Sequence, residues 1–201
     1  MKCFVLAFLA LFPAVTPALP RPSSPPHPSI PSSQAAPSPN PSASAPAAKP
    51  DDVKSIDAIL RALYDVISGP AGPRDWNRFR SLFAPGARLT STAKSATSSA
   101  PRLLTVDDYI HLAGDYFDTH GFFEAAIVNR VQKFGNIAQV FSSYESRNAA
   151  NEKPFARGIN SMQLFYDGSR WWVLSILWDE ESPINPLPPE MASKPSSPVS
   201  E

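Results

Sequence analysis

The sequence predicts an α+β domain in which three N-terminal helices cover a cone-like, curved antiparallel sheet. Between residues 51 and 120, apolar residues recur at the three- and four-residue spacing of amphipathic helices. After residue 121 the pattern changes to four long apolar runs bounded by turn residues, which is typical of antiparallel strands. Helices followed by a run of strands indicate one layer of helices packed on one sheet. Because strands of this length twist and bend, we expect a cavity between the two layers.

The first helix is expected within residues 51–68, where isoleucine, leucine and valine side chains fall on one face. Asp51 or Asp52 can cap its start, since a short carboxylate side chain accepts hydrogen bonds from the first free N–H groups. Gly69 and Pro70 follow, and together they end the helix.

A second, short helix is expected after Asp75, its predicted N-cap. Residues 87–102 then suggest a short strand followed by a serine-rich loop. The third helix is expected to begin at Thr105, with Asp108 three residues later in a near capping box. Gly121 suits the position just past its end.

Four strands complete the domain, joined in pairs by tight turns. Gly135 turns the first hairpin, and the dipeptide Asp167-Gly168 is a strong signal for the second. The expected strands are residues 122–134, 136–147, 158–166 and 170–181.

The last strand, "RWWVLSILWDEE", is apolar on both sides of the expected pleat, so we expect it to be buried on both faces. Its end at Trp178 and Asp179 is expected at the rim of the cavity. Strict alternation places Trp172, Leu174, Ile176 and Trp178 on one face, and Trp171, Val173, Ser175 and Leu177 on the other.

The rest of the chain is predicted to be a leader and two disordered segments. Residues 1–18 have the charged start, apolar run and small residues of a signal peptide, so we expect export to the periplasm or the medium. In residues 19–50, 11 of the 32 residues are proline and most of the others are serine or alanine, as in disordered linkers. Residues 183–201 have the same character. The folded domain is therefore expected to be residues 51–182.

Composition argues against several classes of site. Cys3 is the only cysteine and lies in the expected leader, so the mature chain has no thiolate for catalysis or metal binding. The three histidines have no partners at metal-ligand spacing, so we expect no metal and no cofactor. The 18 Lys and Arg residues are balanced by 18 Asp and Glu and form no basic stripe, so we expect no nucleic-acid binding.

The order of helices and strands resembles the nuclear transport factor 2-like superfamily, and within it the SnoaL-like branch. The stretches that carry the resemblance are "IDAILRALYDVISGPAGPRDWNRFRSLFAPGARL", "FGNIAQVFSSYESR" and "ARGINSMQLFYDGSRWWVLSILWDEE". The superfamily includes polyketide cyclases, ketosteroid isomerase, dehydratases and transport adaptors, so the resemblance implies a fold with a conical pocket and no single function. Its members often dimerise through the sheet, and a homodimer of that kind is expected here.

Two glutamates of the first hairpin are the candidate catalytic residues. If Lys133 faces Asn136 across the turn, then Glu124 lies directly opposite Glu145, with Arg130 on the same face. Two carboxylates in a cavity would raise one pKa and provide a general acid or base. Alternatively, this face is solvated or lies in a dimer interface, and nearby arginines pair with both acids.

Other candidates would contact a ligand. Arg157 can clamp a carboxylate or phosphate, or it can pair with a neighbouring acid such as Glu145 or Asp179. The expected ligand-binding residues are Trp76, Phe79, Tyr109, Arg157, Asn160 and Trp178.

Three functions are consistent with the sequence. The first is an exported domain that binds a small, partly apolar molecule in a conical pocket. The second is a lyase or isomerase that uses Glu124 or Glu145 as a general base. The third is a dimeric interaction module whose pocket is filled by its own aromatic side chains.

Overall fold

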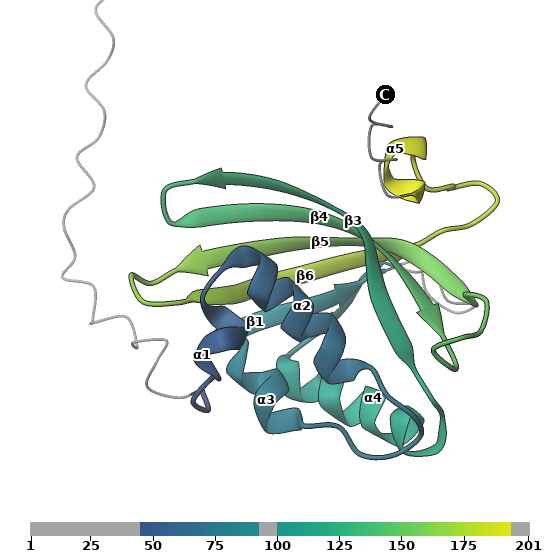
Figure 1. The fold of residues 1–201 in the computed structure, drawn as a ribbon, viewed down its shortest axis with the longest axis horizontal. Coiled ribbons are helices and arrows are strands. Elements are labelled where there is room, and N and C mark those ends of the chain that lie inside the picture. The colour runs from purple at the N-terminus through teal and green to yellow at the C-terminus, as the bar shows by residue number, and fades with distance from the viewer. Residues whose placement is uncertain (1–44, 93–99, 194–201) are drawn as a thin grey trace, which may run out of the picture. The chain divides into compact units, whose positions relative to one another are not determined.

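A computed structural model of the protein describes residues 45–92 and 100–193 (Figure 1). The helices are α1 (Pro50–Val53), α2 (Ile56–Ile67), α3 (Trp76–Ser81), α4 (Val106–Thr119) and α5 (Pro189–Ala192). The strands are β1 (Phe83–Ser91), β2 (Arg102–Leu104), β3 (Phe123–Phe134), β4 (Ile137–Arg147), β5 (Ala156–Tyr166) and β6 (Trp171–Glu180).

The strands form one curved sheet that is open, with the order β2-β1-β6-β5-β4-β3 (Figure 1). The predicted α+β class is confirmed, with one difference in the sheet. It is mixed, because β1 pairs with β6 in parallel while all other neighbours are antiparallel. The chain reaches β6 from β1 only after β2, α4 and three further strands, so no local turn could have indicated this pairing.

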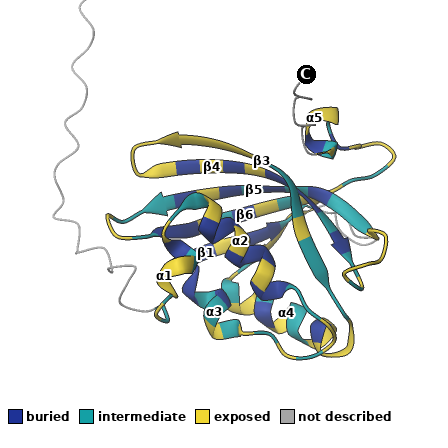
Figure 2. Cartoon of the chain, in the orientation of Figure 1, coloured by how far each residue is buried: buried dark blue, intermediate teal, exposed yellow. Residues whose placement is uncertain are grey.

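Helices α2, α3 and α4 cover one side of the sheet, which we call the inner face (Figure 1). Its apolar side chains pack against the buried side of α2, where Ile59 and Leu60 are completely buried (Figure 2). The cap of α2 differs from the prediction. Ser55 is the N-cap, and its Oγ accepts a hydrogen bond from the N–H of Ala58, because the chain already makes a separate short turn, α1, at the predicted aspartates.

The caps of the two other helices are as predicted. The carboxylate of Asp75 accepts from the N–H of Arg78 at 2.9 Å at the start of α3. At α4, Thr105 and Asp108 form a reciprocal capping box. Gly135 makes the β3–β4 turn with φ of +53°, and Asp167 accepts three hydrogen bonds within the β5–β6 turn.

Two β-bulges change which side chains share a face. In β3 the pairing shifts by one residue at Ile127, since Ala126 faces Tyr144 while Val128 faces Ser143. In β6 it shifts at Leu174. A bulge inserts one unpaired residue and bends the strand, so alternation is reset beyond it.

The bulge at Leu174 makes the predicted alternation of β6 wrong. Its inner face carries Trp171, Val173, Ile176 and Trp178. Burial on both faces is also wrong for part of the strand, because Leu174 and Leu177 are exposed.

The folded region extends beyond residue 182. Residues 183–193, expected to belong to a disordered tail, include α5, which contacts β3 and β4 and lies apart from α2, α3 and α4 (Figure 1). Met191 is 1% exposed and Leu187 9%, so this segment is anchored by apolar burial that its composition did not indicate. The predicted signal peptide, most of the predicted linker, the middle of the serine-rich loop and residues 194–201 lie outside the described residues.

Candidate functional site

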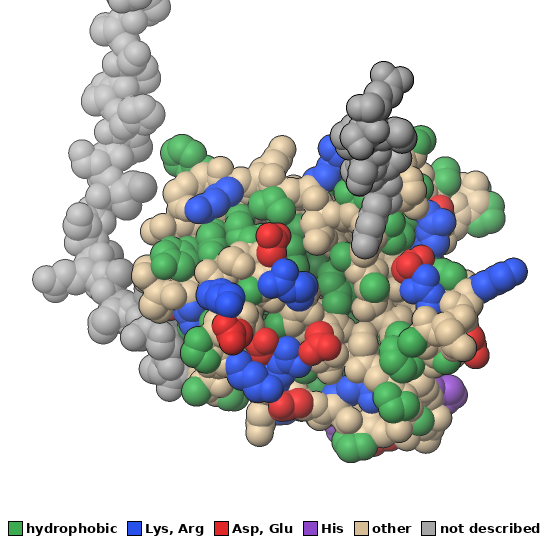
Figure 3. Space-filling model, viewed as in Figure 1, with side chains coloured by type: hydrophobic (Ala, Val, Ile, Leu, Met, Phe, Trp, Pro, Cys, Tyr) green, Lys and Arg blue, Asp and Glu red, His purple; other side chains and the backbone are tan. Residues whose placement is uncertain are grey.

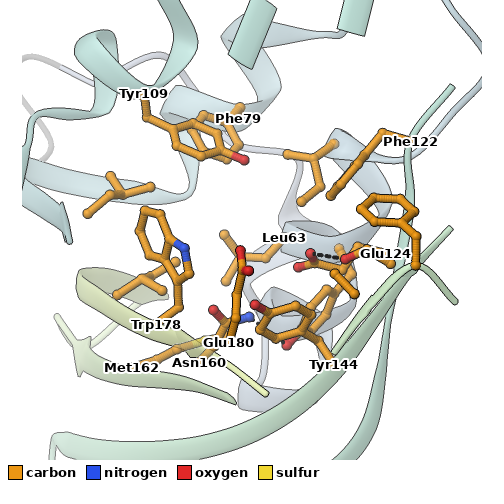
Figure 4. A pocket seen from close by; sticks show the side chains of 17 residues that line it. Leu63, Phe79, Tyr109, Phe122, Glu124, Tyr144, Asn160, Met162, Trp178 and Glu180 are labelled. Carbon is orange, nitrogen blue, oxygen red and sulfur yellow. Dashed lines mark hydrogen bonds between the residues drawn. The ribbon is translucent and has the colours of Figure 1, made fainter. Parts of the chain in front are cut away.

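A cavity of about 200 Å³ lies between the inner face of the sheet and the helices (Figure 4). This volume is smaller than the roughly 300–1,000 Å³ of pockets that hold drug-sized molecules. Its wall is mostly aromatic and aliphatic, with a few polar groups from β3, β4, β5 and β6. The lining side chains are Leu63, Tyr64, Ile67, Phe79, Leu89, Tyr109, Phe122, Glu124, Tyr144, Ser146, Phe155, Ala156, Asn160, Met162, Ile176, Trp178 and Glu180.

Glu124 extends into the cavity from β3 (Figure 4). The bulge at Ile127 places it there, because without this extra residue the even-numbered positions of β3 would keep the outer face that Arg130 and Gln132 occupy. Its backbone is anchored to the end of α2, since its N–H donates to Ser68 Oγ at 2.9 Å. Its carboxylate accepts a hydrogen bond from Ser146 Oγ at 2.9 Å.

The surroundings of Glu124 favour its neutral form. Burial raises the pKa of Glu124 from 4.5 to about 7, because a charged carboxylate is poorly solvated beside apolar walls. Hydrogen bonds from Ser146 and the Asn160 amide oppose this rise, and the negative charge of Glu180 adds to it. The carboxyl group can therefore gain or lose a proton close to neutral pH.

A hydrogen-bonded chain runs behind the cavity from β5 through α2 to β4 and β3. The Asn160 amide donates to Tyr64 Oη at 3.2 Å, and Tyr64 Oη donates to Ser142 Oγ at 2.6 Å. Ser142 Oγ in turn donates to Asn129 Oδ1 at 2.6 Å. The buried members, Asn160, Tyr64 and Ser142, satisfy one another, so the chain holds Asn160 and Tyr64 in place at the cavity wall.

Three tyrosines border the cavity, Tyr64 from α2, Tyr109 from α4 and Tyr144 from β4. Burial raises the pKa of each above the ordinary value of 10, and the negative charge of Glu124 raises it further. All three therefore keep their protons at neutral pH and can donate hydrogen bonds. Tyr144 reaches the cavity across Gly158, where a Cβ atom would lie 2.6 Å from its hydroxyl oxygen.

Glu180, at the end of β6, is a second carboxylate that points into the cavity (Figure 4). The cavity opens beside it into a surface groove between α4 and the segment around β2. Tyr109, Phe122, Trp178 and Glu180 border both the cavity and the groove. A ligand that enters through the groove therefore passes Glu180 before it reaches Glu124.

Five of the residues expected from the sequence line the cavity: Phe79, Tyr109, Glu124, Asn160 and Trp178. Three others do not. The predicted pairing of Glu124 with Glu145 is wrong, because Glu124 faces Ser146 and Glu145 faces Ala125 on the outer face.

The three residues that lie outside the cavity have other partners. Glu145 forms an ion pair with Arg147 at 2.5 Å. Arg157 forms one with Glu181 at 3.2 Å, which is the alternative in which this arginine pairs with a nearby acid. Trp76 packs behind the cavity wall, with its ring 5.7 Å from that of Phe79 and nearly perpendicular to it.

Sequence reasoning missed Glu180, Tyr64, Tyr144 and Ser146 as cavity residues. Glu180 lies at the polar end of the last strand, and only its pairing with Gly158 shows that it lies on the inner face. Tyr64 could have been found, since it falls on the apolar face of α2 yet carries a hydroxyl group that needs a partner when buried.

Among the described residues, no three His, Cys, Asp or Glu side chains are grouped closely enough to bind a metal ion. Within the same ranges, none of the helices combines the length and apolar character needed to cross a bilayer. On the face seen in Figure 3, basic and acidic side chains lie next to one another. Arg78 forms ion pairs with both Asp52 and Asp65.

No protein-family model and no curated protein sequence matches the chain. Among solved structures, the Kfla4162 protein from Kribbella flavida is similar over 64% of this chain and 90% of its own, at 13% identity and a TM-score of 0.50. A nuclear transport factor 2-like protein of unknown function from Pseudomonas putida KT2440 is similar over 62% and 82%, at 13% identity and a TM-score of 0.49.

A third solved structure, a cystatin-like protein of unknown function from Nostoc punctiforme, is similar over 64% of this chain and 90% of its own, at 11% identity and a TM-score of 0.49. At such identities a similarity concerns the fold and not the function. The SnoaL-like branch stays a prediction. The described elements, with α2, α3 and α4 against a curved open sheet, have the nuclear transport factor 2-like fold that the sequence predicts, and membership of the superfamily stays a prediction.

Proposed function

We propose that the protein binds a small molecule with an apolar body and one polar group, and that the polar group lies against Glu124. The observation that carries this proposal is the position of the Glu124 carboxylate inside a cavity whose other walls are largely aromatic and aliphatic. Apolar walls with a few convergent polar groups are the usual composition of small-molecule sites. Export of the domain, expected from its first residues, would place this binding outside the cytoplasm.

Thermal melting of the full chain against a library of small amphipathic compounds tests the proposal. A ligand that binds only the folded protein raises the melting temperature. At a ligand concentration of 100 times its Kd, it adds about 2.7 kcal/mol to the free energy of unfolding. We expect shifts for the wild type and loss of these shifts in Ala156→Phe, which narrows the cavity. Glu145→Gln, a change on the outer face, should keep them. A library without any shift, or equal shifts in Ala156→Phe, would disprove the proposal.

Proton transfer is a second candidate function, favoured by one specific observation. The pKa of Glu124 is raised to about 7, so at neutral pH this carboxylate can accept a proton from carbon or oxygen and return it. Tyr109 and Tyr144 keep their protons and line the same cavity, so they can stabilise an oxyanion on the substrate.

Steady-state kinetics on any compound that binds tests this second candidate. If Glu124 is the general base, kcat/KM rises with pH and levels off above an apparent pKa near 7. Glu124→Gln should remove the activity and leave binding of the same compound measurable. Turnover that is independent of pH between about 5 and 8 would exclude Glu124 as the base.

A further inference from the structure

The charged side chains that line the cavity are all acidic, which is not expected of a site for an acidic ligand. Of the lining residues, two are carboxylates, Glu124 and Glu180, and no Lys, Arg or His is among them. They point into the cavity from β3 and β6 (Figure 4). Any ligand of the function proposed above therefore meets a site with two acids and no base.

Neither of these carboxylates forms an ion pair with a residue in the described part of the chain. Glu124 accepts hydrogen bonds from neutral groups, Ser146 and Asn160. By contrast, two nearby acids outside the cavity have arginine partners, because Glu145 pairs with Arg147 and Glu181 with Arg157. The arginines available near this end of the sheet are thus used outside the cavity, and its own acids are left without a counter-charge.

The aromatic walls of the cavity add a second attraction for positive charge. The rings of Tyr109 and Trp178 are 6.4 Å apart and nearly perpendicular, at 87°, so they form a corner of the wall. Phe79 stacks on Tyr109 at 5.3 Å and holds that ring in place. Aromatic rings set at angles around a small space are the arrangement that binds ammonium groups, because the negative face of each ring attracts the cation.

We propose that the ligand of this cavity is an organic cation, a small amine or quaternary ammonium compound held between Glu124 and Glu180 and against the rings of Tyr109 and Trp178. A cation supplies the counter-charge that the described residues do not. An anionic ligand would be repelled by Glu180 and by the ionised form of Glu124. This inference rests on the proposed binding function and specifies its ligand class.

The protonation state of Glu124 gives the proposal a distinctive pH dependence. The groups that face this carboxyl are Glu180 from β6, Tyr64 from α2, Tyr109 from α4, and Tyr144, Ser146 and Asn160 from β4 and β5. A bound cation favours the ionised form and lowers the pKa of Glu124 from its value of about 7 in the free protein. The affinity for a permanent cation therefore rises with pH through about 7 and levels off above it.

Two probes of the same shape separate charge from apolar contact. Choline and 3,3-dimethylbutan-1-ol differ only in a positively charged nitrogen in place of a neutral carbon. Isothermal titration calorimetry of the full chain at about pH 6 and about pH 8 compares them. We expect choline to bind about tenfold more tightly than the alcohol at the higher pH, and to lose most of this preference at the lower pH.

Two variants assign the effect to particular carboxylates. Glu124→Gln should weaken choline binding at the higher pH and remove its pH dependence. Glu180→Gln should weaken choline at both pH values but keep the dependence. Asp179→Asn is the matched control, because it removes a negative charge next to Glu180 at a residue that does not line the cavity. This variant should leave the preference for choline unchanged.

The possible failures are distinguishable. If the neutral alcohol binds as tightly as choline, the inference of a cationic ligand is overturned and the proposed binding function stands. If neither probe binds, the inference is also overturned, and the library screen decides whether the binding function fails with it. A choline affinity that Glu124→Gln and Glu180→Gln both leave unchanged would place the cation outside this cavity and overturn the inference as well.

Discussion

At the scale of single residues, the two glutamates of the first hairpin show how position decides chemistry. Glu124 and Glu145 belong to paired strands, yet they lie on opposite faces of the sheet. Glu145 keeps an arginine partner outside the cavity, whereas Glu124 has a pKa raised to about 7 by burial. Of these two glutamates, Glu124 therefore has the environment of a ligand-binding or catalytic carboxylate.

Glu124 should make the stability of the protein depend on pH. Its pKa in the folded state is raised from 4.5 to about 7, so between these values the folded protein holds a proton that the unfolded chain has released. The free energy of unfolding is therefore expected to fall as pH rises from about 4.5 to about 7, by on the order of 3 kcal/mol, and then to level off.

Urea unfolding at about pH 5 and about pH 8 measures this contribution. Glu124→Gln should lose most of the fall and be more stable than the wild type at the higher pH. Glu145→Gln should retain the wild-type dependence, since its carboxylate lies outside the cavity. If the free energy of unfolding of Glu124→Gln falls with pH as much as that of the wild type, the effect belongs to other groups.

Gly158 is expected to be intolerant of even one methyl group. A Cβ atom there would lie 2.3 Å from the carbonyl oxygen of Asp179 and 2.6 Å from Tyr144 Oη, so Tyr144 would have to leave the cavity wall. Gly158→Ala should cost about 1–3 kcal/mol and weaken ligand binding. Gly114→Ala is the matched control within α4, because its Cβ would make only an ordinary van der Waals contact with the Trp76 ring at 4.0 Å, and the change should increase the free energy of unfolding by about 0.5–1 kcal/mol. Equal stability of the two variants would contradict this account.

At the scale of elements, the loop between α2 and α3 is organised by one side chain. The guanidinium group of Arg74 donates to four backbone carbonyl oxygens at 2.8–2.9 Å. It also lies 5.0 Å from the ring of Phe117 in α4. Arg74 thus satisfies carbonyl groups at the end of α2 and links the loop to the helix that carries Tyr109. The four carbonyl groups belong to Ile67, Gly69, Pro70 and Gly72.

Arg74→Lys should destabilise the protein although the charge is retained. A lysine ammonium group has a different donor geometry and cannot reach four carbonyls that surround a planar fork. We expect a loss of about 1–3 kcal/mol in the free energy of unfolding, measured by urea titration. Arg61→Lys, on the exposed side of α2, serves as the control and should change stability by less than about 0.5 kcal/mol.

At the scale of the whole molecule, the outer face of the sheet remains accessible over much of its area. Phe134, Ile137, Phe141 and Leu177 lie on this face and are exposed. Figure 2 shows exposed residues along the projecting end of the β3–β4 hairpin. Scattered apolar residues are normal on a surface, but several on one sheet face are typical of an interaction site.

Homodimer formation through the sheet, expected from the resemblance, stays a prediction and can be tested on this face. Sedimentation velocity at micromolar concentration should give a dimer for the wild type and a monomer for Phe141→Asp, which introduces a charge on the outer face. Leu103→Asp, at an even more exposed apolar residue in β2, should remain dimeric. A monomeric wild type would exclude this assembly at that concentration.

Features that depend on a few adjacent residues were predictable from the sequence. The N-caps Asp75 and Thr105 and the turns at Gly135 and Asp167 are as expected, because each is stabilised by hydrogen bonds or backbone angles within about four residues. The order of helices and strands follows from the same local patterns.

Only the tertiary structure decided which side chains enter the cavity. The bulge at Ile127 turns Glu124 inward, and the pairing of Gly158 with Glu180 brings a second carboxylate beside it. Strand register and bulges depend on packing between residues that are far apart in the chain, and a shift of one residue moves every side chain beyond it to the other face. The amino-acid sequence alone therefore determined the fold class and the order of the elements, whereas the tertiary contacts determined the strand pairing and the composition and charge of the candidate site.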